Sequence, residues 1–261
     1  PRGDPPPALG GGHSRPALRQ RVAGAGGGAA GVGGHPHPPG ARRPNRGAGT
    51  LNKQLGLPVY ASGGTARQLC YRIAFLEERI HTFRPGEHFE IGTLGVETFP
   101  TSHDAAEPTG YALTGGGRKA AVVTDLGYVT GAVLRGIRGA ALLVAEATHD
   151  VEWVQSGPYP YHLKARILGD RGHLSNEAGA ELAGRAALAG TRTILLAHLS
   201  SENNTPARAR EVVSRRLSAL GVRPEEDITL AVAPRSECGA LYQLERGGAL
   251  RAFPAREASL C

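Results

Sequence analysis

Four side chains that suit metal binding or acid–base chemistry each stand where an apolar run of the sequence ends. The runs predict buried strands, and the residues that follow or close them are His103, Asp125, Glu146 and His198. In layered α/β folds the strand ends carry the chemistry, because the sheet holds them rigidly while the loops leave room for a ligand. Two imidazoles and a carboxylate are ligands that Zn²⁺ or Mn²⁺ accepts. We therefore expect a metal site that contains His103, Asp125 and His198.

Each of these three residues also has a purely structural interpretation. His103 could be a surface histidine beside an Asx-turn, and His198 could be a satisfied histidine of the core. Asp125 could cap a helical segment that begins at Val129. An Asp that closes an apolar run is costly to bury unless it is paired or bound to a metal. Asp125 could bridge two metal ions with one oxygen on each, and Asp104 could fix the tautomer of the neighbouring His103 ring.

Glu146 and His173 form a candidate acid–base pair. A buried Glu beside a His is a common way to orient an imidazole for acid catalysis. The other interpretation makes His173 a helix-entry residue, with Ser175 or Asn176 as the cap. We expect His149 to have a supporting role, bonded to a backbone carbonyl, rather than to bind a metal.

A loop rich in proline and tyrosine lies between these motifs, at residues 156–166. Tyr159 and Tyr161 alternate with proline, and Lys164 and Arg166 follow them. Aromatic rings can stack on nucleobases, and the two bases can hold phosphates. The other interpretation is a proline-stiffened loop packed by its own aromatic rings, with exposed bases after it.

Composition limits the class of protein. With 40% hydrophobic and 20% charged residues, the chain is typical of a globular protein with one substantial core. No apolar run approaches the ~20 residues that span a bilayer, and no signal-peptide pattern stands at the start. The three cysteines are scattered, which favours a reducing cytoplasm over a disulfide framework. We therefore expect a cytoplasmic location and no membrane contact; the oligomeric state stays open.

The first 50 residues differ in composition from the rest. They hold 14 of the 38 Gly, 9 of the 19 Pro and seven Arg against one acid, so most of the net charge of +7 lies there. One interpretation of residues 1–46 is a disordered basic tail; another is an out-of-frame translation of a GC-rich gene. Because the chain lacks Met and starts at Pro1, we also expect it to be incomplete at its start. We place the folded domain at 47–261.

From residue 47 the sequence predicts strands in the first half and strand–helix alternation in the second, which fits two stacked sheets with helices outside. Thr65 is the expected cap of one helix, and Gly92 and Gly95 are expected turns or bulges. Proline at the first position favours a helix after Thr205. The expected helices are 48–57, 65–78, 175–189 and 205–220, and the expected strands are 58–61, 87–99, 111–114, 120–124, 140–145, 193–197 and 228–232.

Taken together, the motifs resemble the metallo-β-lactamase fold, and in particular its YycJ/WalJ-like branch of exonucleases. The resemblance covers about residues 47–244. The segments that carry it are Ser102-His-Asp-Ala-Ala-Glu-Pro, Thr124-Asp-Leu-Gly-Tyr-Val-Thr, Glu146-Ala-Thr-His-Asp-Val-Glu, Gly157-Pro-Tyr-Pro-Tyr-His-Leu-Lys-Ala-Arg-Ile-Leu, Gly172-His-Leu-Ser-Asn and His198-Leu-Ser-Ser-Glu-Asn-Asn.

The resemblance implies an α/β fold, a four-layer αββα metallo-β-lactamase sandwich, incomplete at the N-terminus here. It also implies a two-metal (Zn or Mn) hydrolase of phosphodiesters, a 5′-to-3′ exonuclease acting on DNA. His103 and His198 would each ligate one metal, Asp125 would bridge the two, and His173, oriented by Glu146, would protonate the leaving oxygen.

One departure from the family pattern concerns the metal ligands. A His-x-His-x-Asp-His loop should precede residue 48, but here His35-Pro-His37 is followed by neither the Asp nor the third His. We therefore expect incomplete metal binding and impaired activity. Two other functions stay open: hydrolysis of a small ester, thioester or cyclic phosphodiester on the same fold, and a non-catalytic nucleic-acid-binding module.

Overall fold

A computed structural model describes residues 52–235, 239–244 and 250–253. The expected boundary after residue 46, the two interpretations of residues 1–46, and His35 and His37 all lie outside the described residues. In the described part of the chain no helix is both long and apolar enough to cross a bilayer.

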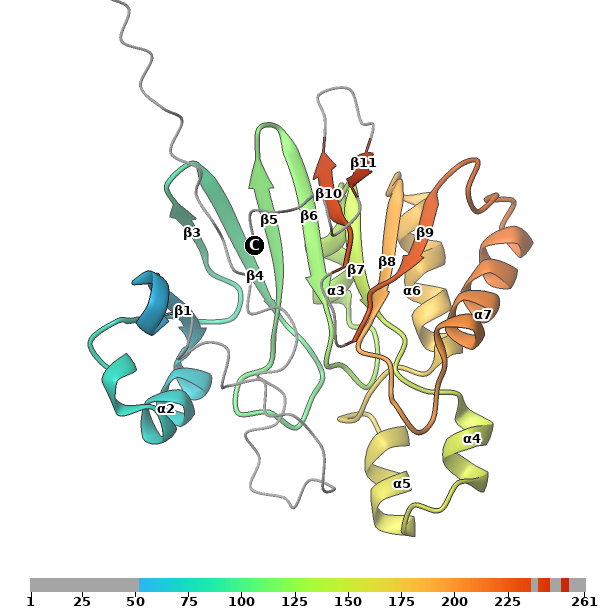
Figure 1. Ribbon diagram of the computed structural model, residues 1–261, viewed down its shortest axis with the longest axis horizontal. Helices are drawn as coiled ribbons and strands as arrows, with labels where there is room; N and C mark the ends of the chain where they lie inside the picture. Colours follow the sequence, from blue (N-terminus) through green and yellow to red (C-terminus); the bar gives the residue numbers. More distant parts are fainter. Residues whose placement is uncertain (1–51, 236–238, 245–249, 254–261) are drawn as a thin grey trace, which may run out of the picture.

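A seven-stranded mixed sheet organises the fold, with the strand order β3-β4-β5-β6-β7-β8-β9. Its first half, from β3 to β6, is antiparallel, and β6 to β9 are parallel to one another (Figure 1). The antiparallel half corresponds to the expected run of strands, and the parallel half to the expected strand–helix alternation. The strands are β3 (His88–Ile91), β4 (Leu94–Pro100), β5 (Thr109–Gly115), β6 (Arg118–Val123), β7 (Leu142–Glu146), β8 (Thr193–Ala197) and β9 (Thr229–Val232).

Three helices pack against one face of this sheet: α3 (Gly131–Ile137), α6 (Asn176–Leu188) and α7 (Pro206–Ala219). Two apolar clusters fill the contact, one from β4–β7 with α3 and α6, the other from β8 and β9 with α6 and α7. Phe99 of β4 packs between two glycines, since a Cβ on Gly110 or Gly136 would lie 2.3 or 2.2 Å from its ring. Only glycine lets α3 approach β4 this closely, which fixes the strand that leads to His103.

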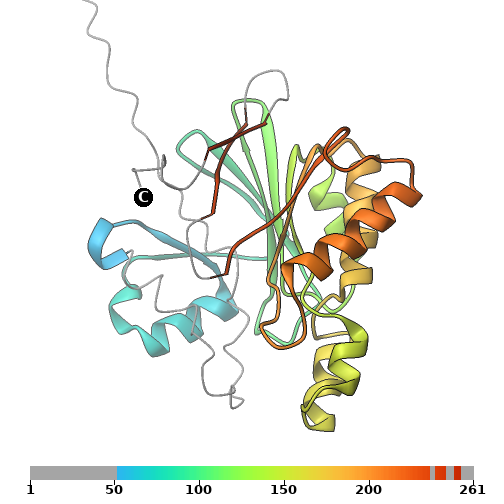
Figure 2. The same cartoon turned by 45° about the vertical axis from the view of Figure 1, so that its right-hand side comes forward.

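Smaller elements lie on the side of the sheet away from α6 and α7 (Figure 2). They are β1 (Val59–Ser62) paired in parallel with β2 (Ile80–Phe83), helix α2 (Gly63–Arg72), and the hairpin β10 (Leu241–Leu244) with β11 (Leu250–Phe253). The α/β class is therefore confirmed. Where the expected sandwich has a second sheet, the described residues form two separate strand pairs, β1–β2 and β10–β11.

Three local predictions were wrong. The loop expected at 156–166 ends at Pro160, because helix α5 (Tyr161–Leu168) begins at the next residue. The helix expected at 65–78 begins at Gly63 and ends at Arg72, with a short 3₁₀ turn over Ala74–Leu76 after it. Its N-terminus is held from outside, because the Gly64 N–H donates to Glu107 Oε2 at 2.5 Å. Gly95 was an expected turn or bulge, but it pairs in register with Thr114 inside β4.

Two short helices, α4 (Val151–Ser156) and α5 (Tyr161–Leu168), project beyond the end of the sheet. They form the connection between β7 and α6. Only Val154 of α4 is buried, and α5 buries no residue.

Candidate metal centre

The carboxyl ends of four strands meet at one edge of the sheet. Strands β6, β7 and β8 are parallel neighbours, and two antiparallel pairings give β4 the same direction as β6. His103 follows β4, Asp125 follows β6, Glu146 ends β7 and His198 follows β8. The topology therefore brings together the four strand-end residues that the sequence indicated.

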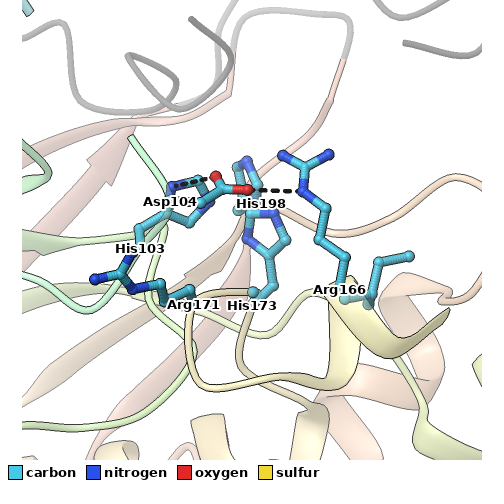
Figure 3. Close-up of a pocket in the computed structure, with 8 residues that line it drawn as sticks. His103, Asp104, Arg166, Arg171, His173 and His198 are labelled. Carbon is cyan, nitrogen blue, oxygen red and sulfur yellow. Dashed lines mark hydrogen bonds and ion pairs between the residues drawn. The ribbon is translucent and has the colours of Figure 1, made fainter. Parts of the chain in front are cut away.

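The side chains of these residues lie close to one another and to His173; Figure 3 shows the three histidines His103, His173 and His198. His198 Nε2 lies 3.3 Å and His173 Nδ1 lies 4.0 Å from Asp125 Oδ1. One ligand atom each of His103, Asp125 and His173 lies within 4.8 Å of the others, and the same holds for Glu146, His173 and His198. The His173 ring stands between the other two, with ring centroids 5.0 Å from His103 and 4.9 Å from His198.

Two residues of the cluster have a left-handed backbone. Asp125 has φ +60° and His198 has φ +62°, which costs about 1–3 kcal/mol for a residue other than glycine. Neighbouring contacts hold this geometry: Gly127 N–H donates to Ser102 O at 2.7 Å, and Thr148 Oγ1 lies 2.9 Å from His198 O. Strain of this kind concentrates at functional sites.

Glu146 is the fully buried hub of the cluster. Its Oε1 lies 2.7 Å from His173 Nδ1 and 3.1 Å from His198 Nδ1, and it accepts a hydrogen bond from Thr148 Oγ1 at 2.5 Å. Its Oε2 accepts the Leu126 N–H at 2.9 Å. The predicted pairing with His173 is present, but the link to His198 and the part of Thr148 were missed. A threonine between two charged motif residues gives no periodic signal in the sequence.

The charges of the cluster follow from these contacts. Burial would raise the pKa of Glu146, but its hydrogen bonds with His173 and His198 outweigh burial and lower it, so the carboxylate is ionised. Burial acts to lower the pKa of His198, yet the hydrogen bond with Glu146 and the charge of Asp125 raise it to about 9. Burial lowers the pKa of His103, and the charge of His173 acts in the same direction. His103 is therefore a neutral imidazole near pH 7, the form that binds metals.

Asp104 links His103 to Arg166. Its Oδ2 accepts from Arg166 Nε at 2.7 Å, and its Oδ1 lies 3.2 Å from His103 Nδ1 (Figure 3). The Ala105 N–H lies 3.1 Å from the same Nδ1 and donates to it only when that nitrogen carries no proton. When the ring carries its proton on Nδ1, Asp104 accepts it and Nε2 is available to a metal. Burial acts to raise the pKa of Asp104, but the hydrogen bond from Arg166 outweighs it and lowers the pKa.

Asp125 does not cap a helix. Helix α3 begins at Gly131, and its cap is Thr130, whose side chain accepts the Val133 N–H. Among the described residues, Asp125 Oδ1 is a buried oxygen without a hydrogen-bond partner. A buried carboxylate oxygen without a donor, facing imidazole nitrogens, matches the donor set of a Zn²⁺ or Mn²⁺ site. The residues present therefore fit a divalent metal ion.

The non-catalytic interpretations of the other histidines can be compared with the positions of their side chains. Ser175 caps α6 by accepting the Ala178 N–H, so His173 does precede a capped helix while its ring lies in the cluster. The His103 side chain is buried, whereas the His198 side chain is 31% exposed. Neither the surface-histidine interpretation of His103 nor the core-histidine interpretation of His198 matches this placement. His149 is buried, and its Nδ1 has no hydrogen-bond partner among the described residues.

A cavity of about 210 Å³ opens over the histidines. Of the four predicted substrate-binding residues, only Arg166 lines it. Tyr159 is half-buried, Tyr161 is 86% exposed, and Lys164 Nζ donates to Gln155 O at 2.6 Å. A second arginine of the cavity wall, Arg171, was missed, because nothing in its local pattern separates it from other surface arginines.

Comparisons with known proteins identify the family of the chain. Residues 45–199 match the model of the beta-lactamase superfamily domain. The chain is 40% identical over 177 residues to exodeoxyribonuclease YycJ of Bacillus anthracis, and 36% identical over 181 residues to exodeoxyribonuclease WalJ of Streptococcus pneumoniae strain D39; each match covers 67% of both proteins. A crystal structure of the metallo-beta-lactamase fold protein YhfI from Bacillus subtilis aligns with a TM-score of 0.49 and 15% identity, over 70% of this chain and 66% of that one. Because the family model covers more than half of the sequence and the similarity to YycJ and WalJ extends over two thirds of it, the chain belongs to the beta-lactamase superfamily, in the YycJ/WalJ-like branch.

Proposed function

We propose that this protein is a metal-dependent phosphodiester hydrolase of the exodeoxyribonuclease type, with DNA as its substrate and two divalent ions, Zn or Mn, as its cofactors. The observation that carries the proposal is the buried Oδ1 of Asp125, which accepts no hydrogen bond among the described residues and lies 3.3 Å from His198 Nε2. Asp125 also forms a potential metal-binding group with His103 and His173. The exodeoxyribonuclease names of the relatives support DNA as the substrate. The proposed direction of cleavage is 5′ to 3′.

His103 and His198 would each hold one ion, and Asp125 would bridge them. Such a pair of ions would lower the pKa of water and neutralise charge on the phosphate oxygens. The protein contributes a rigid donor set, since the ligands are fixed by the sheet and by the strained turns at Asp125 and His198.

His173 is the proposed general acid. Glu146 Oε1, 2.7 Å from Nδ1, orients the ring so that Nδ1 carries a proton. The opposite nitrogen, Nε2, can then give a proton to the leaving oxygen of the sugar, and the carboxylate stabilises the charged ring before the transfer. Glu146 acts through His173 and is a positioning residue.

The remaining predicted residues stay proposals for contact with the DNA strand. Arg166 lines the cavity beside the histidines and can reach a phosphate there. Tyr161, exposed on α5, presents a ring on which a base can stack. Lys164 and Tyr159 lie on the same projecting segment, outside the cavity. A polymer suits this exposed basic segment better than a small ester, which needs no contact outside the cavity.

The proposal includes impaired activity, because no His-x-His-x-Asp-His loop stands in the sequence. The test has two parts. Zinc and manganese in the purified chain are measured by inductively coupled plasma mass spectrometry, and degradation of 5′- and 3′-labelled single strands is compared with hydrolysis of a small thioester. Substoichiometric metal with weak, metal-stimulated DNA degradation is the expected result. Full metal content with fast turnover would refute the impairment, and thioester hydrolysis without DNA degradation would refute the nuclease. The cytoplasmic location stays a prediction.

A further inference from the structure

The two arginines of the cavity differ in their partners. Arg166 is held by Asp104, with 2.7 Å between Nε and Oδ2. Arg171 forms no ion pair and donates no side-chain hydrogen bond within the part of the chain that the model describes. A guanidinium on a cavity wall, next to imidazoles and without a carboxylate of its own, is suited to an anionic ligand such as a phosphate.

The backbone that carries Arg171 is rigid. The turn is closed by hydrogen bonds from Gly172 N to Gly169 O at 2.8 Å and from His173 N to Ile167 O at 3.1 Å. It also packs against the loop after Asp125, because a Cβ on Gly127 would lie 2.3 Å from the Asp170 carbonyl. The backbone of Arg171 is therefore fixed before binding, so that only its side chain has to be ordered by a ligand.

The two guanidinium groups lie on opposite sides of the histidine cluster in Figure 3. Arg171 reaches past His103, and Arg166 stands beyond His173 and His198. A single phosphate on the metal-binding residues would have one cation on each side. A strand of linked phosphodiesters, by contrast, presents further phosphates on both sides of the one that reacts.

We propose that Arg171 binds the phosphate next to the scissile one, and that Arg166 binds a phosphate on the other side only after it releases Asp104. This assignment rests on the proposed nuclease function and names the class of ligand, a single-stranded DNA backbone. Arg171 is thus available to a phosphate at all times, whereas a phosphate must compete with Asp104 for Arg166. The assignment predicts opposite effects of two substitutions on strand binding. Loss of Arg171 should weaken it, and neutralisation of Asp104, which releases Arg166, should strengthen it.

The test measures binding without catalysis. A 3′-fluorescein-labelled single strand of about 12 nucleotides is titrated with the full chain in EDTA, and fluorescence anisotropy is followed at several salt concentrations. Arg171→Gln should weaken binding about 5–10-fold at low salt, as expected for loss of a charge-assisted contact. It should also reduce the slope of log K against log salt by about 0.7, the value for one phosphate contact on a single strand. Arg171→Lys should keep the slope.

Matched controls separate a specific contact from net charge. Arg138→Gln removes one exposed cation that follows α3, at the end of the sheet opposite to the cluster. Glu181→Gln breaks an exposed pair with Arg216 outside the cavity. Asp104→Asn should strengthen binding about 2–5-fold, by removing a competitor of the phosphate, whereas Glu181→Gln should not. Equal affinities and salt slopes for Arg171→Gln and Arg138→Gln would overturn the proposal.

The outcome is separable from that of the nuclease proposal. If the chain degrades no DNA even with added Mn²⁺, but Arg171→Gln still lowers affinity and slope, the phosphate contact stands and the catalytic proposal falls. If DNA is degraded while Arg171→Gln binds like Arg138→Gln, the phosphate contact falls and the catalytic proposal stands. A wild-type chain that does not bind the strand at all overturns the assignment of Arg171.

Discussion

The strand-end cluster and the α4–α5 segment are neighbours in space, but they are built in opposite ways. Glu146 at the centre of the cluster is fully buried and bonded on both oxygens, whereas α5 buries no residue at all. The cluster is held by strands of the central sheet, which are buried in the core. The α4–α5 segment is attached mainly at its ends. The difference fits the proposed function, in which the buried cluster would hold the metal ions and the exposed α4–α5 segment would contact the substrate.

Removal of the Glu146 carboxylate should have the largest effect on stability. Glu146→Ala leaves the Leu126 N–H and two imidazoles without their buried partner, and such losses cost about 3–5 kcal/mol. Urea unfolding followed by circular dichroism measures the free energy. Glu97→Gln is the control, because Glu97 is a partly exposed partner of Lys119 and should cost less than about 1 kcal/mol. Similar losses in the two variants would contradict the role of Glu146 as a hub.

The contact between the two regions is tested by one glycine. In Gly127→Ala the new Cβ would meet the Asp170 carbonyl carbon and oxygen at 2.3 Å. Backbone cannot move aside as a side chain can, so the loop after Asp125 must shift, at a cost of about 1–3 kcal/mol. Gly131→Ala is the matched control, since its Cβ would meet only the end of the Arg135 side chain, at 3.4 Å. A drop in melting temperature confined to Gly127→Ala is the expected result; equal melting temperatures would mean that the loops separate easily.

The anchor of the projecting segment is Asp150. Its buried side chain caps α4 through the Glu152 and Trp153 N–H groups and accepts Arg208 Nε at 2.7 Å. Asp150→Ala should cost about 1 kcal/mol or somewhat more, the usual value for a cap. Limited proteolysis should then cut first within residues 151–172. Unchanged cleavage sites and stability would show that α4 is held by other contacts.

The same residue predicts a pH dependence. Burial acts to raise the pKa of Asp150, but the hydrogen bond from Arg208 and those of the cap outweigh it, so the folded-state pKa lies below 3.8. A depressed pKa contributes stability above the unfolded value, and that stability is lost as the pH falls through the folded pKa. Melting temperatures from pH 7 to pH 3 should therefore decline less steeply in Asp150→Asn than in the wild type. Parallel curves would contradict this contribution.

The sequence predicted His103, Asp125, Glu146 and His198 because each of them closes or follows an apolar run. To predict that these strand ends lie at a common edge, one needs only the directions of the strands, and the alternation of helices and strands gives those directions. Thr148 and Arg171 could not be found in this way, since both stand in loops where periodicity is absent and only the fold shows their neighbours. The start of α2 was misplaced for a related reason: the group that holds it is Glu107, 43 residues away from Gly64. Local patterns identify elements, and contacts distant in the sequence decide where they begin.

The smallest effect on stability is expected at Tyr161, where the comparison of the two regions is sharpest. Its side chain is 86% exposed, so Tyr161→Ala should change the free energy of unfolding by less than about 0.5 kcal/mol. If the ring stacks on a base, the same change should weaken binding of single-stranded DNA by about 1–3 kcal/mol. Tyr71→Ala is the control, because Tyr71 is 91% exposed on α2, outside the cavity. A loss of binding confined to Tyr161→Ala, at unchanged stability, would show that the α4–α5 segment serves binding and not stability. Equal binding by the two variants would contradict stacking of a base on Tyr161.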